Sequence, residues 1–236
     1  MRFDIDRLQT FYGSPLGRMA QDMVARRVGA LWPSLDGLDV LGFGHADSLL
    51  ERYRGGARRV VSASPDEQGA VRWPADARGL AALVEEDRLP FPDALFDRLV
   101  VFHGLEESDS PQRLLREFWR IAAPEARILI IVAHRRGLWA RAESTPYGHG
   151  RPYTRSQLYR LLEVAMFMPT ASARALYAPP IGWGVITSAG DAWERIGRFA
   201  WAGFGGVLMI EATKRLYIEP GKPVRAKRVV KAPARR

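Results

Sequence analysis

The chain has 236 residues, of which 47% are hydrophobic and none is cysteine. A chain of this length can bury one sizeable core, and the lack of cysteine excludes disulfides and thiolate zinc sites. Four histidines leave little for a metal site, so none is expected. The first residues contain acids and no apolar run, and no stretch is apolar enough to span a membrane. We therefore expect a soluble, cytoplasmic protein.

The net charge of +9 is concentrated near the C-terminus. Residues 219–236 contain seven basic residues and one acid. So many like charges cannot support a packed core, which predicts a disordered basic tail. The tail could attract RNA or an acidic protein partner, but the same charge could serve solubility alone.

Residues 1–35 predict an N-terminal helical cap that is interrupted at residues 13–17. After the interruption, apolar residues such as Met19, Met23 and Val28 recur at helical spacing and are expected to face the core. Phe11 and Tyr12 come just before the interruption. They could cover a pocket or simply anchor the cap.

Residues 38–53 predict the first unit of a parallel α/β fold. A short apolar strand is followed at once by Gly42 and Gly44, and then by a helical pattern from Ser48 to Tyr53. Glycines at the carboxyl end of a strand let backbone N–H groups approach a ligand. A tight turn without a ligand fits the same residues, because two spaced glycines are a weak signal.

Further apolar runs alternate with amphipathic stretches along the chain. They predict strands at residues 58–63, 96–102, 127–133, 171–177 and 207–217, a third short strand or a helix end at residues 80–84, and helices at residues 111–122, 154–165 and 191–201. This alternation predicts an α/β protein with a mostly parallel sheet and helices on both faces. Glu85, Glu86 and Asp87 directly follow the third strand. They could form a solvated turn, or one of them could accept a hydrogen bond from a ligand amine.

Residues 134–153 show neither helical nor strand periodicity. A loop this long inside a compact domain is commonly functional, and this one is too aromatic for disorder. We expect an active-site loop or a lid packed over the sheet. Its candidate substrate residues are Arg141, Tyr147, His149, Arg151 and Tyr153, and the arginines would suit a carboxylate or phosphate.

An ordered set of motifs lies between residues 89 and 132: Leu89-Pro90-Phe91, Phe96-Asp97, Leu105-Glu106, Arg120 and Pro124. As a set it resembles the class I S-adenosylmethionine-dependent methyltransferases that act on small molecules, lipids, quinones and tRNA. A weaker resemblance extends over residues 38–217. It implies a Rossmann-like, doubly wound sheet with a final antiparallel strand, and S-adenosyl-L-methionine as cofactor.

The resemblance also implies positions for the cofactor. Its methionine part would lie over Gly42, Gly44, His45 and Ala46, with Tyr12 nearby, and its adenine would lie at Glu85, Glu86 and Asp87. The motif is degenerate, because Gly42 and Ser62 stand where the family usually has acids. Asp66 and Glu67 follow Ser62 closely and could substitute for the acid that binds the ribose.

His103 is the best placed candidate base, because it directly follows the fourth strand at the ligand-binding edge; a turn hydrogen bond is the alternative role. The predicted function is methyl transfer to an unidentified acceptor, with an activating subunit as a candidate partner. The alternative is a non-catalytic, methyltransferase-like binding subunit. Incomplete glycine spacing and the missing strand-two acid disfavour a nicotinamide dehydrogenase. The expected domains are the cap at 1–35, a methyltransferase-like domain at 36–218 with an insertion at 178–205, and the tail at 219–236.

Overall fold

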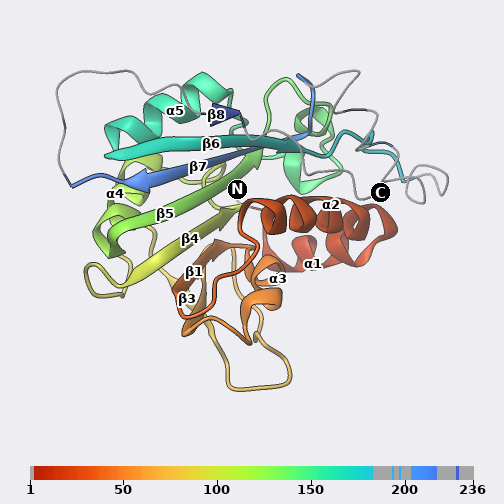
Figure 1. Ribbon diagram of the computed structural model, residues 1–236. Coiled ribbons are helices and arrows are strands. Elements are labelled where there is room, and N and C mark those ends of the chain that lie inside the picture. The colour runs from red at the N-terminus through yellow and green to blue at the C-terminus, as the bar shows by residue number, and fades with distance from the viewer. Residues whose placement is uncertain (1–2, 183–192, 194–196, 198–202, 217–226, 229–236) are drawn as a thin grey trace, which may run out of the picture.

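The computed structural model describes residues 3–182, 193, 197, 203–216 and 227–228, and its centre is one mixed β-sheet (Figure 1). The strand order is β3-β2-β1-β4-β5-β7-β6-β8. β1 to β5 are parallel to one another, whereas β7 is antiparallel to both β5 and β6. The predicted doubly wound sheet, mostly parallel with an antiparallel strand starting at residue 207, is therefore confirmed, although the short strand β8 follows that strand in the chain. The strands are β1 Asp39–Gly44, β2 Arg59–Pro65, β3 Ala81–Val84, β4 Phe96–Phe102, β5 Ala122–Ala133, β6 Phe167–Ala175, β7 Val207–Lys214 and β8 Lys227–Arg228.

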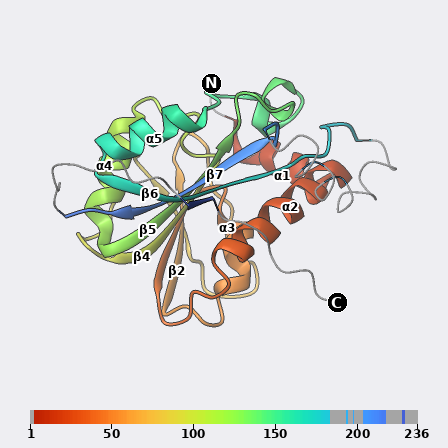
Figure 2. The ribbon, with the colours of Figure 1, turned by 45° about the horizontal axis from the view of Figure 1, so that its top comes forward.

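Helices cover both faces of the sheet, as predicted (Figures 1 and 2). α1 (Ile5–Gly13), α2 (Pro15–Leu31) and α3 (Asp47–Leu50) contribute to one hydrophobic cluster, and α4 (Pro111–Ile121) and α5 (Arg155–Val164) contribute to the other. α4 shows the predicted apolar stripe, because Leu114, Leu115, Phe118 and Ile121 are all buried. Short 3-10 turns follow α3 at Glu51–Tyr53 and occupy the long loop at Trp139–Arg141 and Pro146–Gly148.

The predicted interruption of the N-terminal cap is a sharp corner at Ser14. Its side chain accepts a hydrogen bond from the backbone N–H of Gly17 at 3.0 Å, which caps α2, and Pro15 occupies the first helical position. A side chain at residue 17 would lie 1.9 Å from the Phe11 carbonyl oxygen, so the close crossing of α1 and α2 requires glycine there. The corner brings the end of α1 over the sheet.

Two strands begin earlier than the sequence predicts. β5 starts at Ala122 because the chain leaves α4 in an extended conformation and Ala122 pairs with Phe96 of β4. β6 starts at Phe167 because Phe167 pairs with Lys214 at the end of β7. In both cases pairing with a neighbouring strand extends the element beyond its apolar run.

Several predictions concern residues outside those that the structure describes. They include most of the helix at 191–201, most of the insertion at 178–205, and the disorder of the tail apart from the two residues of β8. The division into cap, domain and tail also stays a prediction. Within the described part of the chain, no helix combines the length and apolarity needed to cross a membrane.

Candidate functional site

Five parallel strands end at one edge of the sheet, and acids follow three of them. Asp66 and Glu67 follow β2, Glu85, Glu86 and Asp87 follow β3, and an acidic segment at residues 106–109 lies beyond β4. The carboxyl ends of β1 to β5 lie together because these strands run in the same direction. Open α/β sheets bind their ligands at this edge.

A first cavity of about 330 Å³ opens between the ends of β2 and β3 and the start of α4. The structure brings the predicted residues Glu85, Glu86 and Asp87 together here with Asp66 and Glu67. Asp109 and Arg113, which the sequence did not single out, complete its polar lining near the N-terminus of α4. The first cavity therefore collects acids from three separate connections of the fold.

A second cavity of about 670 Å³ lies beside the first, and both are lined by Glu67 and Asp109. Its other acids are Asp4, just before α1, and Glu106 and Glu107 after β4. Ser108, Gly150 and Arg151 complete its lining. We call the two cavities together the acidic cleft.

One wall of the second cavity depends on Gly150. This residue has φ +70°, and a side chain on it would lie 2.7 Å from the carbonyl oxygen of Glu106. The next residue, Arg151, donates its backbone N–H to the same carbonyl at 2.7 Å. Glycine at position 150 thus lets the long loop approach the acidic segment after β4 closely.

The glycine turn after β1 lies beneath the end of α1. Gly44, His45 and Ala46 are buried, and the ring of Tyr12 stacks on His45 with the ring centroids 5.0 Å apart. Gly44 has φ +82°, and a side chain on it would lie 2.2 Å from the carbonyl oxygen of Phe102, so the contact between β1 and β4 requires glycine. Gly42 is also buried, within β1 itself.

Ser62 is not at the end of its strand, in contrast to the prediction. β2 continues to Pro65 because it pairs with β3, and Ser62 lies opposite Gly42 inside the sheet. The side chain is only 3% exposed. Asp66 and Glu67, which follow the actual strand end, line the cleft instead.

Three predicted residues from distant segments form one buried chain of hydrogen bonds. The Tyr12 hydroxyl lies 2.7 Å from Nε2 of His103 and donates to the Tyr147 hydroxyl at 2.9 Å. With the Tyr12 proton directed at Tyr147, Nε2 of His103 is the donor to the Tyr12 oxygen. Burial lowers the pKa of His103 well below its usual range, and nearby His45 lowers it further, so His103 is neutral. Burial raises the pKa of both tyrosines, so they keep their protons.

Glu106 is a functional candidate that the sequence did not reveal, because it appears there only as part of the Leu105-Glu106 motif. One carboxylate oxygen accepts a hydrogen bond from the backbone N–H of Ala133 at 3.0 Å, at the end of β5. The other oxygen, Oε2, has no hydrogen-bond partner among the described residues. Burial raises the pKa of Glu106 to about 7. Its position shortly after His103, at the carboxyl end of β4, was the available signal.

The other predicted residues of the long loop have different surroundings. Arg141 is exposed and lines neither cavity, and His149 lies 2.8 Å from the Glu143 carbonyl oxygen through Nε2. Tyr153 is half-buried, and burial together with the charge of Glu106 raises its pKa to about 12. Of the five candidates, only Arg151 lines the cleft. The loop is packed over the sheet around the buried side chains of Trp139 and Tyr147.

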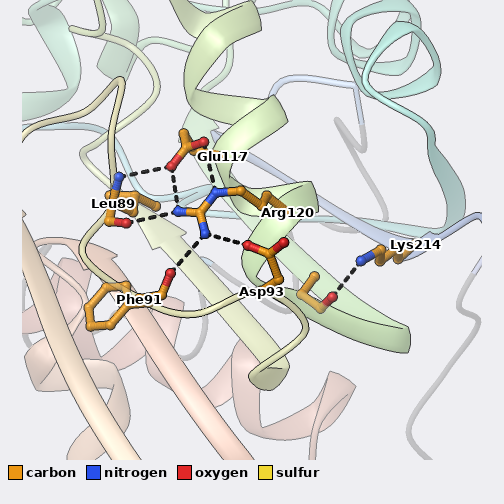
Figure 3. Close-up of polar contacts among 7 residues, drawn as sticks. Leu89, Phe91, Asp93, Glu117, Arg120 and Lys214 are labelled. Carbon is orange, nitrogen blue, oxygen red and sulfur yellow. Dashed lines mark hydrogen bonds and ion pairs between the residues drawn. The ribbon is translucent and has the colours of Figure 1, made fainter.

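The segment that follows the Glu85–Asp87 acids is held by Arg120 of α4 (Figure 3). The guanidinium donates to the carbonyl oxygens of Leu89 and Phe91, both at 2.8 Å, and to the carboxylates of Asp93 and Glu117. Glu117 in turn accepts the backbone N–H of Leu89 at 2.9 Å. Nearby, Lys214 donates to the Ala122 carbonyl oxygen at the start of β5. The motif at residues 89–91 is thus a structural anchor for the turn between β3 and β4.

Comparison with known proteins shows that this chain is similar to methyltransferases. Residues 38–130 match the family described as "Methyltransferase domain". Over 89 residues the chain is 33% identical to norajmaline N-methyltransferase of Rauvolfia serpentina, a match that covers 36% of this chain and 30% of that protein. The matched segment therefore spans less than a third of the length of that relative.

Two solved structures share most of the fold. One is a methyltransferase of Thermotoga maritima, described as a possible histamine N-methyltransferase, with 18% identity, a TM-score of 0.63, and coverage of 89% of this chain and 96% of that chain. The other is a putative methyltransferase of Haloferax volcanii in complex with the Trm112 activator, with 16% identity, a TM-score of 0.64, and coverage of 89% and 94%. At these identities the likeness is one of fold.

Proposed function

We propose that the chain is a class I S-adenosylmethionine-dependent methyltransferase, which transfers the methyl group of this donor to an acceptor bound at the carboxyl edge of the sheet. The observation that carries the proposal is the first cavity, where the acids after β2 and β3 meet. Carboxylates accept hydrogen bonds, and adenosine offers ribose hydroxyls and an amino group as donors. The residues present therefore fit the adenosine half of the donor.

Each acid has a proposed role in this arrangement. Glu85 accepts from the adenine amino group, with Glu86 and Asp87 beside it, and Asp66 and Glu67 accept from the ribose hydroxyls. The donor carries a net positive charge, which the acidic lining of the cleft attracts. Two acids after β2 offset the absence of one at Ser62.

The methionine half is proposed to lie against the turn at residues 42–46. Tyr12 stacks on His45 over this turn, so donor binding requires the ring of Tyr12 to move. The same stack is the observation that favours the second candidate function, a non-catalytic methyltransferase-like subunit in which α1 covers the turn permanently.

Methyl transfer needs little covalent catalysis by the protein, because the thioether released from the sulfonium is a good leaving group. The chain supplies proximity and alignment of the acceptor atom and the methyl carbon. Acceptors that must lose a proton also need a base. His103 is a proposed base, since a neutral imidazole has one nitrogen free to accept a proton. The buried carboxyl of Glu106 is the other candidate.

Calorimetric titration with S-adenosylhomocysteine tests the donor site. Glu85→Gln and Asp66→Asn are each expected to weaken binding about tenfold, because each replaces a charged hydrogen-bond acceptor with a neutral amide. Glu163→Gln, on the exposed face of α5 and outside both cavities, is the matched control and should bind like the unmodified protein. No binding at millimolar ligand, alone or with an activator subunit, would favour the non-catalytic subunit instead.

The proposal also covers the binding partners of the protein and its location in the cell. The Haloferax relative forms a complex with an activator, which supports a protein subunit for this chain as well. The basic residues at 219–236 are proposed to attract RNA or an acidic protein. RNA binding through the tail should weaken steeply with salt, and ending the chain at Pro220 should flatten that dependence. We place the protein in the cytoplasm.

A further inference from the structure

The acidic cleft has a charge opposite to that of the protein as a whole. The chain carries a formal net charge of +9, yet six acids line the first cavity and five line the second, with two common to both. Arg113 and Arg151 are the only basic residues in the lining of these two cavities. A concave surface lined by one sign of charge concentrates ligands of the opposite sign.

Two buried side-chain oxygen atoms at the second cavity lack hydrogen-bond partners among the described residues. Glu106 is 4% exposed and Ser108 is 2% exposed. Oε2 of Glu106 and Oγ of Ser108 make no hydrogen bond with any residue that the structure describes. Burying a polar group without a partner is costly, so these atoms are expected to bind water, an ion or a ligand. Both residues line the second cavity.

The arrangement of the acids suits an organic cation better than a metal ion. In the described part of the chain, no three acids or histidines converge as metal ligands. The acids are instead spread around a cavity of about 670 Å³, which lies within the range of small-molecule pockets, roughly 300–1,000 Å³. Acids dispersed in this way can pair with several ammonium groups on one extended molecule.

We propose that the second cavity binds the methyl acceptor, and that this acceptor is a small organic cation with two or more amino groups. The assignment rests on the proposed methyltransferase function. Asp4, Glu67 and Asp109 pair with the outer ammonium groups, and Glu106 contacts the nitrogen that receives the methyl group. This departs from the carboxylate or phosphate ligand that Arg141 and Arg151 suggest in the sequence.

The transfer step balances with Glu106 as the proton acceptor. The accepting ammonium group gives one proton to the Glu106 carboxylate, which leaves a lone pair on nitrogen. That pair forms the new N–C bond as the C–S bond of the donor breaks, and the electrons of the C–S bond remain on sulfur. The sulfonium becomes a neutral thioether, and the positive charge passes to the methylated nitrogen.

The groups around Glu106 are compatible with this role. Glu107 lies beside it in the sequence, Tyr12 approaches from α1, and Tyr147 and Tyr153 approach from the long loop. The three tyrosines do not compete as bases for an ammonium proton, because burial raises the pKa of each and keeps them protonated. The pKa of Glu106 itself is about 7. Binding a cation next to it should lower that pKa and release protons near pH 7.

Calorimetry on the full chain tests the site without relying on catalysis. Spermidine and putrescine are the probes, and 1,4-butanediol and succinate are the neutral and anionic controls of matched length. We expect only the two amines to bind, more weakly as salt rises. Titrations in buffers of different ionisation enthalpy should reveal proton release at pH 7. Glu106→Gln, which keeps the size of the side chain, should abolish that release.

Variants at exposed acids test the site with less risk that a loss of binding results from misfolding. The double variant Glu67→Gln/Asp109→Asn should weaken spermidine binding about tenfold or more, whereas Glu163→Gln should leave it unchanged. The proposal is overturned if the unmodified protein and these two variants bind spermidine with equal affinity, or if the unmodified protein does not bind it at millimolar concentration. If S-adenosylhomocysteine binds to a protein that ignores both amines, the methyltransferase function stands and the assignment of the cavity fails.

Whether a bound amine is the methyl acceptor is tested by a separate measurement. With S-adenosylmethionine present, mass spectrometry should detect methylated putrescine or spermidine. Binding of both donor and amine without any methylated amine overturns the acceptor role. Amine binding without S-adenosylhomocysteine binding means that the cavity holds a cation but that the proposed function is wrong.

Discussion

The hydroxyl of Tyr12 lies 2.7 Å from Nε2 of His103, although 91 residues separate them in the sequence. The contact joins the end of α1 to the carboxyl end of β4, and Tyr147 extends it into the long loop. His103 has φ +51°, an uncommon backbone conformation for a residue other than glycine. The three side chains therefore tie the cap, the sheet edge and the loop together beside the acidic cleft.

Tyr12→Phe should destabilise the protein by about 1–3 kcal/mol, because it leaves His103 and Tyr147 without their common buried partner while the ring still fills its place. Urea unfolding measures the change. Tyr159→Phe is the matched control, since the Tyr159 hydroxyl on α5 has no hydrogen-bond partner among the described residues and its loss should cost less than about 0.5 kcal/mol. Equal stability of the two variants would contradict the role of the network.

Glu106 should make stability depend on pH. Its pKa rises from the ordinary 4.5 to about 7 in the folded protein, so the folded state holds its proton more tightly than the unfolded state. The stabilising contribution is complete below about pH 4.5 and is lost as the pH rises through about 7, by roughly 3 kcal/mol in total.

The measurement for Glu106 is urea unfolding of the protein and of Glu106→Gln from pH 4 to pH 8. The amide does not titrate, so the difference between the two free energies of unfolding should change across this interval in favour of Glu106→Gln at high pH. A constant difference would mean that Glu106 titrates normally and that its burial has been overcome by solvent.

Arg120→Lys should loosen the turn that follows the Glu85–Asp87 acids. Lysine cannot reproduce the planar set of donors that reaches Leu89, Phe91, Asp93 and Glu117, so we expect a loss of about 1–3 kcal/mol. Affinity for S-adenosylhomocysteine should fall as well. Arg116→Lys, at an exposed position of the same helix, controls for the change of residue type.

Trp139 should hold the long loop against the fold. It is 1% exposed, and its indole N–H donates to the Ala178 carbonyl oxygen at 2.7 Å. Trp139→Ala should cost about 3–5 kcal/mol and speed tryptic cleavage after Arg141 and Arg151. The neighbouring Leu138 is 56% exposed, so Leu138→Ala should change neither stability nor cleavage. Rapid cleavage of the unmodified loop would indicate a free linker.

The sequence by itself determined the elements and their class. Runs such as residues 127–133 are apolar enough to be buried strands in any context, and the stripe of Leu114, Leu115, Phe118 and Ile121 specifies one buried helix face. The order of strands and helices then leaves few alternatives to a parallel sheet. The acids after the third strand were visible for the same reason, because their position relative to a strand end is local information.

Only the tertiary structure decided which residues meet. Pairing with β3 carried β2 three residues past Ser62, so Asp66 and Glu67 reached the cleft and Ser62 did not. The crossing of α1 and α2 put Tyr12 over His45 and beside His103. Burial of Glu106 beside the end of β5 raised its pKa. Strand register, helix crossing and desolvation arise from contacts between distant residues, whereas sequence patterns record only the preferences of neighbours.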